Sequence, residues 1–199
     1  MRIEIVLCIA ALISAVAQAG TIEQALILAD PQMQVKDGAI RGCGYRLKGM
    51  PKDISTAKSV VLLDTSFNLF SPGVGLLKGG ATQVTLKGGT PVNRPIESFW
   101  IRAQGERPTP PPKTEVKPAE TKGYLLYVVP MEATLHLFAA VREQTPLMIG
   151  MRIKGEGIDR IYAGTVEVSD KDQAQVGECM GELIKQMEHD LEAKETAPR

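Results

Sequence analysis

Cysteine is the residue type in this sequence whose chemistry is easiest to interpret. The 199-residue chain has three cysteines, and Cys8 lies in an apolar N-terminal run. Cys43 and Cys179 have no histidine close in sequence that would activate a thiolate for nucleophilic catalysis. In an exported chain they could form one disulfide, which closes a loop of about 136 residues and stabilises the fold by ~4–5 kcal/mol in the chain-entropy model. We therefore expect a Cys43–Cys179 disulfide, with two separately buried thiols as the alternative.

The two histidines, His136 and His189, are the candidates for a general base. Both fall on the polar side of an expected helix, so solvated surface positions are the simpler interpretation. A hydrolase would need one of them beside a carboxylate and a hydroxyl within hydrogen-bond reach. The chain contains no Gly-x-Ser-x-Gly, His-Glu-x-x-His or Cys-x-x-Cys sequence. The sequence therefore assigns no catalytic residue, no metal ligand and no cofactor site.

A glycine-rich stretch at residues 73–80 is the one candidate for a phosphate-binding loop. A P-loop needs Gly-Lys-Ser/Thr at the start of a helix, whereas here Lys78 precedes two glycines and a strand-like pattern follows. We instead expect turns at residues 78–80 and 87–89 on either side of a strand at residues 81–86. Asp170 and Asp172 are explained by the positive end of a helix dipole rather than by metal binding.

The N-terminus resembles a cleaved secretory signal. Arg2 precedes an apolar run from Ile5 to Val16, and Ala17-Gln18-Ala19 places small residues at the positions a signal peptidase reads. Cleavage after Ala19 predicts a periplasmic or secreted protein, with no stable membrane insertion because twelve apolar residues are too few to span ~30 Å of hydrocarbon. The chain has 23 basic and 23 acidic residues, and this neutral balance argues against nucleic acid as a partner.

The clearest predicted element is a helix from Ser169 to Glu192. Ser169 is the expected N-cap, and the apolar residues of this segment recur at helical spacing on one side. Gly177 and Gly181 lie one turn apart inside the helix, where each costs ~1 kcal/mol relative to alanine. We expect them to allow close packing against the protein's own sheet, with an interface to another chain as the second interpretation.

The remaining elements predict a sheet-rich fold. Asp37-Gly38 indicates a hairpin turn between strands at residues 33–35 and 39–47, whereas residues 21–30 fit either a short helix or a strand. Trp100, the only tryptophan, lies in a strand at 96–103 and is a candidate interface residue. Further expected elements are strands at 59–70, 124–129, 147–153 and 160–168 and a helix at 131–142.

These elements predict an α+β protein with a mostly antiparallel sheet of about seven to nine strands and two amphipathic helices packed on one face. We expect one domain from 20 to 192, made of a strand-rich half (20–104), a proline-rich loop or linker (105–122) and a β-α-β-β-α half (123–192), followed by a disordered tail (193–199). The predicted function is non-enzymatic binding of a cell-envelope protein, of inhibitor, immunity or envelope-accessory type. An envelope hydrolase using a histidine and a small apolar ligand-binding protein are the alternatives.

Overall fold

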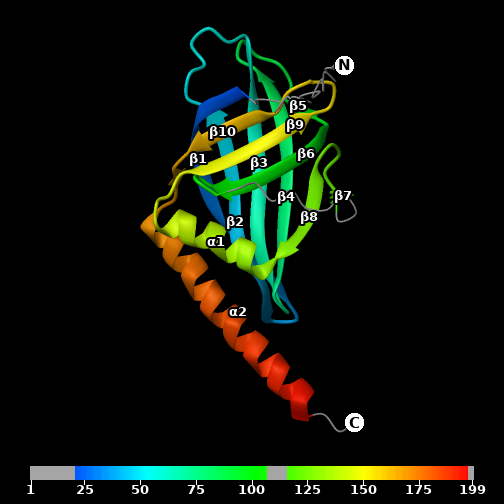
Figure 1. Ribbon diagram of the computed structural model, residues 1–199, viewed down its shortest axis with the longest axis vertical. Coiled ribbons are helices and arrows are strands. Elements are labelled where there is room, and N and C mark those ends of the chain that lie inside the picture. The colour runs from blue at the N-terminus through cyan, green and yellow to red at the C-terminus, as the bar shows by residue number, and fades with distance from the viewer. Residues whose placement is uncertain (1–20, 107–115, 197–199) are drawn as a thin grey trace, which may run out of the picture.

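The protein is sheet-rich, with eleven strands and two helices in the part of the chain that the computed structural model describes, residues 21–106 and 116–196 (Figure 1). The predicted signal sequence lies outside the described residues. The strands are β1 (Thr21–Lys36), β2 (Ala39–Pro51), β3 (Ser59–Phe70), β4 (Val74–Thr85), β5 (Val92–Arg94), β6 (Ile96–Ala103), β7 (Val116–Pro118), β8 (Leu125–Pro130), β9 (Leu147–Ile153), β10 (Arg160–Gly164) and β11 (Val166–Glu167). The helices are α1 (Met131–Arg142) and α2 (Asp170–Thr196).

All eleven strands belong to one hydrogen-bonded sheet. Its order is β6-β9-β10-β1-β2-β3-β4-β8-β7, with β5 paired to β4 and β11 paired to β1. Every pairing is antiparallel except those of β1 with β10 and β11, which are parallel. The count exceeds the predicted seven to nine because β5, β7 and β11 have three, three and two residues, too few to give a periodic signal.

The sheet bends back on itself into two layers. In Figure 1, β6, β9 and β10 cross in front of β2, β3 and β4. Two buried tyrosines join the layers, because Tyr162 of β10 donates to the Val61 carbonyl at 3.0 Å and Tyr127 of β8 accepts from the Phe99 backbone N–H at 3.1 Å. β1 contributes to both layers, since its first residues pair with β10 and its remainder pairs with β2.

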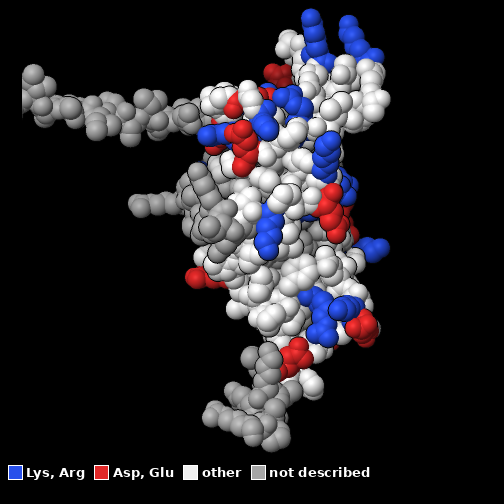
Figure 2. All heavy atoms as spheres, turned by 90° about the vertical axis from the view of Figure 1, so that its right-hand side faces the viewer, with Lys and Arg blue, Asp and Glu red and all other residues white. Residues whose placement is uncertain are grey.

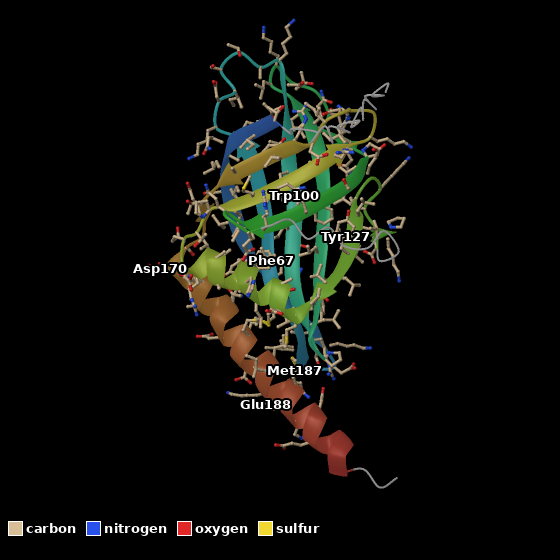
Figure 3. All side chains as sticks on the ribbon, in the orientation of Figure 1. Phe67, Trp100, Tyr127, Asp170, Met187 and Glu188 are labelled. Carbon is tan, nitrogen blue, oxygen red and sulfur yellow. A yellow bond between two sulfur atoms is a disulfide. The ribbon has the colours of Figure 1, made fainter. Side chains whose placement is uncertain are left out.

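The space between the layers holds the main core. Alternate residues of each long strand point into it, which is the two-residue period expected of a sheet with one buried face. The rings of Tyr45, Phe67 and Phe138 cluster with centroids 5.1–6.0 Å apart, and Figure 3 shows Phe67 behind α1. The largest fully buried side chains are Tyr127, Tyr162, Phe67, Phe99, Ile27, Leu47, Leu63, Leu69, Leu147, Ile149, Met151 and Ile153.

The predicted turn at residues 78–80 is wrong, because β4 runs through it from Val74 to Thr85. Gly79 and Gly80 are instead platforms for aromatic rings on opposite sides of this strand. A Cβ added at Gly79 would lie 2.6 Å from Cδ2 of Phe99, and one at Gly80 would lie 2.4 Å from Cδ1 of Tyr124. The second predicted turn, at residues 87–89, does end the strand.

Local sequence signals account for several other element boundaries. The Asp37-Gly38 turn joins β1 to β2 as predicted, with φ angles of 54° and 77° that suit a two-residue hairpin turn. Residues 21–30, which fit a helix or a strand, form the first part of β1. The proline-rich stretch 105–122 contains β7, which pairs with β8, whereas residues 107–115 lie outside the described part.

The final helix begins as predicted and ends later. The Ser169 Oγ accepts from the Asp172 backbone N–H at 3.1 Å and donates to the Asp172 carboxylate at 2.6 Å, a reciprocal N-terminal cap. Because α2 continues to Thr196, the predicted tail is wrong for residues 193–196, and 197–199 lie outside the described residues. Neither helix is long and apolar enough to cross a membrane, within the residues that the structure describes.

The predicted disulfide joins Cys43 of β2 to Cys179 of α2. Both cysteines are buried with Leu69 and Leu183 in a small second cluster, against which Met187 also packs. The bond fixes α2 on β2, and Asp190 further along the helix pairs with Arg41 of β2, with Oδ2 and Nη1 3.7 Å apart. In Figure 1 only the last part of α2 runs past the end of the sheet.

Candidate functional site

The residues that could supply catalysis lie apart from one another. The disulfide removes both buried cysteines as nucleophiles. His136 has Nδ1 3.6 Å from Oε1 of Glu106, but the two side chains are 59% and 43% exposed. His189 lies on an exposed position of α2. In the described ranges, no three His, Cys, Asp or Glu side chains lie close enough together to hold a metal ion.

Trp100 packs on the protein's own sheet while keeping part of its surface exposed. Its ring lies over Gly150 of the neighbouring β9, where an added Cβ would be 2.2 Å from Cε2 of the indole. The Arg102 guanidinium lies 4.9 Å from the ring centroid, within the range of a cation–π contact. Gly150 therefore explains how a large ring lies flat on the outer side of this layer.

The expectation that Gly177 and Gly181 pack closely against the sheet is wrong. Both residues are exposed, and a Cβ added at either position would meet no atom within 4 Å. The buried side of α2 is formed by Val176, Cys179 and Leu183 instead. Packing within this chain thus gives no reason for two glycines in the helix interior.

Gly177 does line an apolar groove between α1 and α2. The groove has a volume of about 350 Å³. Tyr45 and Phe138 lie inside it with ring centroids 6.0 Å apart, and burial, followed by the nearby Asp172 carboxylate, raises the pKa of the Tyr45 phenol. The remaining lining residues are Leu135, Ala139, Arg142, Gln173, Val176 and Met180. We call this hollow the helix groove.

Apolar side chains on the two helices remain in contact with water. Leu135 of α1 is 38% exposed, and Ile184 of α2, two turns beyond Gly177, is 46% exposed. Helical periodicity places both on buried stripes, so the sequence does not reveal the groove. A hydropathy pattern gives the direction of a side chain but not whether another element covers it.

The second helix carries an excess of negative charge along its length, whereas the one charged residue of the described chain that lines the groove itself is Arg142. In Figure 3, Asp170 marks its start at the edge of the sheet, and Met187 and Glu188 lie further along it, where Met187 still packs against the cluster around the disulfide. The face that holds β7 and β8 differs, since basic and acidic side chains are interspersed over it (Figure 2). From residue 170 to 192 the acidic residues are Asp170, Asp172, Glu178, Glu182, Glu188, Asp190 and Glu192, against Lys171 and Lys185.

Comparison with known proteins gives no relative from which a site could be transferred. No protein-family model, no curated protein and no solved structure matches this chain.

Proposed function

We propose that this chain is an exported, non-enzymatic protein that acts by binding another protein of the cell envelope, as an inhibitor, immunity or accessory factor. The helix groove receives the partner. The observation that carries the proposal is an apolar groove beside two exposed glycines that no contact within the chain explains. The Cys43–Cys179 disulfide is compatible with export, because such bonds persist outside the reducing cytosol.

The partner segment is a basic amphipathic one. Its apolar side would cover Leu135, Phe138 and Met180, and the missing side chains of Gly177 and Gly181 would let its backbone approach α2 closely. The acidic excess of α2 favours Lys and Arg on the partner's polar side. Charges at the rim of such an interface mainly raise the association rate and specificity, whereas the apolar contacts supply affinity.

The test compares variants of the helix groove in partner capture. Gly177→Gln together with Gly181→Gln fills the groove margin without a clash inside the chain, so the fold should persist while capture from an envelope extract is lost. Gly157→Gln, at another glycine with open space around it, is the matched control and should retain the partner. A photo-crosslinking residue at position 184 should label a basic segment of the captured protein.

Equal capture by the double variant and the control would overturn the assignment of the helix groove. Labelling of an acidic segment would contradict the charge argument. Retention of no partner, together with turnover of a peptidoglycan or lipid substrate, would favour the hydrolase. In that case His136→Ala would abolish turnover and Glu106→Gln would weaken it.

Export itself has a direct test. Expression of the full chain in a bacterial cell should yield a periplasmic product whose N-terminal residue is Gly20, as measured by intact mass. A product that retains residues 1–19 would contradict cleavage after Ala19.

A further inference from the structure

The outward face of β1–β4 carries apolar side chains where a half-buried sheet normally exposes polar ones. On these strands the inward residues, such as Ile27 and Leu63, fill the core, so their neighbours point away from it. Leu28 is 43% exposed on that outward side. With Pro91, which precedes β5, the outward residues form a hollow of about 350 Å³ that is mostly apolar. Its apolar lining is Leu26, Leu28, Met50, Leu62, Val84 and Pro91, and Arg46, Lys48, Asp64 and Thr82 also line it.

A cluster of charged and polar groups adjoins the apolar hollow on the same face. Nε and Nη2 of Arg46 each donate to the Asp64 carboxylate at 2.7 Å, and the Tyr124 hydroxyl donates to Asp64 at 3.1 Å. Arg46 and Asp64 line both the apolar hollow and a second hollow of about 250 Å³, which Gln32, Ser66, Lys78 and Thr121 also line. The two hollows therefore meet at this ion pair.

The charged cluster has one positive charge in excess. Arg46 and Asp64 neutralise each other, and Lys48, which also lines the apolar hollow, is neutralised by Asp30. Lys78 makes no ion pair with a residue of the described part of the chain. The Lys78 Nζ lies 5.9 Å from the centroid of the Tyr124 ring, which rests on Gly80. Since Arg46 uses Nε and Nη2 for Asp64, its Nη1 remains as a donor for an incoming oxygen. One ligand with a single negative charge would balance the cluster.

We propose that the outward face of β1–β4 binds a fatty acid. The hydrocarbon chain lies in the apolar hollow, and the carboxylate lies at Lys78 and the Nη1 of Arg46. A neutral sterol or hydrocarbon would leave the excess charge unused, and a dianionic head group would exceed it. This site is separate from the helix groove, because Tyr45 of that groove points inward from β2 whereas Arg46 points outward.

Calorimetric titration of the purified, lipid-stripped chain with dodecanoate, below its micellar concentration, tests the proposal. We expect saturable binding of one molecule per chain. Octanoate, with four fewer methylenes, should bind roughly a hundredfold more weakly if the chain lies in the apolar hollow. Dodecanol should bind at least tenfold more weakly than dodecanoate, because it lacks the charge that Lys78 pairs with.

Variants locate the carboxylate. Lys78→Met keeps the aliphatic stem and removes the charge, and should weaken dodecanoate binding about tenfold while leaving dodecanol unchanged. Lys171→Met, at an exposed position of α2, is the control and should bind like the unmodified protein. Circular dichroism would show that both variants are folded. The comparison of dodecanoate, octanoate and dodecanol uses the unmodified chain, so it tests the proposal even if a variant misfolds. Absence of saturable dodecanoate binding, equal affinity for dodecanol, or no effect of Lys78→Met would overturn the proposal.

Discussion

At the scale of single residues, glycine serves opposite purposes in β4 and α2. Gly79 and Gly80 are required because the aromatic rings of Phe99 in β6 and of Tyr124, just before β8, lie directly on them. Gly177 and Gly181 have open space around the missing side chain. Gly79 and Gly80 therefore contribute to the stability of the fold. Gly177 and Gly181 lower the stability of α2, and no contact within the described chain offsets that cost. For this reason we propose that the second pair serves binding.

Alanine substitutions should separate these purposes. Gly177→Ala and Gly181→Ala should each raise the free energy of unfolding by ~0.5–1 kcal/mol, because alanine is the better helix former and meets no neighbour. Gly79→Ala should lower it by ~1–3 kcal/mol, since the new Cβ would overlap the buried Phe99 ring. Urea denaturation of the variants measures both signs, and stabilisation by Gly79→Ala would contradict the ring contact.

The buried Tyr162 predicts a loss of stability at alkaline pH. Burial, followed by the charge of Glu23, raises its pKa from 10 to about 12. Well below pH 10 the phenol is neutral in both states and stability is unaffected, whereas from about pH 9 to pH 12 the unfolded chain ionises first. Stability therefore falls over that range, by at most ~3 kcal/mol.

Tyr162→Phe is the control for this pH dependence. It should remove part of the alkaline loss and leave the loss that comes from Tyr45, Tyr124 and Tyr127, whose pKa values burial also raises. Denaturation midpoints measured from pH 8 to pH 11 give the two curves. Parallel curves would show that Tyr162 does not contribute.

At the scale of elements, the sequence correctly predicts those helices and strands whose residue pattern is long and depends only on neighbouring residues. The helix at 131–142 and the strand at 59–70 have the predicted bounds, and the Asp37-Gly38 turn is correct because two-residue hairpins have specific residue requirements. The glycines of β4 resemble a turn in the sequence because a long-range ring contact is invisible to local reasoning. The helix groove and the outward hollow escape prediction for the same reason, since each requires several separated segments to be placed together.

The cap of α2 gives a prediction for an element boundary. Ser169→Ala removes the acceptor for the Asp172 N–H and should lower the free energy of unfolding by ~1 kcal/mol. Gln175→Ala, at an exposed position inside the same helix, should change it by less than ~0.5 kcal/mol. Guanidinium denaturation compares the two, and an equal effect would show that the cap contributes nothing particular.

At the scale of the whole molecule, contacts between distant parts of the chain hold the two layers and α2 together. The Tyr162–Val61 and Phe99–Tyr127 hydrogen bonds join the layers, and the disulfide ties α2 to β2. The disulfide is predictable because only two cysteines remain once Cys8 is assigned to the signal sequence. The bending of the sheet is not predictable from the sequence, because local residue patterns do not reveal very short strands or whether two strands pair in parallel or antiparallel.

Removing the disulfide should destabilise the whole molecule. Cys43→Ala with Cys179→Ala should lower the free energy of unfolding by ~2–5 kcal/mol, because the cysteines close a loop of 136 residues in the unfolded chain. Thermal unfolding in the absence of reductant measures the loss. The unmodified protein in reductant should show a similar decrease, and an unchanged midpoint in both cases would contradict the loop-closure argument.

The parallel pairing of β1 with β10 and β11 constrains the order in which this protein can fold. Thr21 pairs with Arg160, and Ile27 pairs with Val166. One edge of β1 therefore stays unpaired until residues 160–167 are available to pair with it. Contacts of such long sequence separation give a high contact order, and folding is correspondingly slow. During synthesis the N-terminal strands emerge first with that edge unpaired, which is the kind of surface that aggregates or recruits a chaperone. The final architecture therefore forms only after nearly the whole chain has been synthesised.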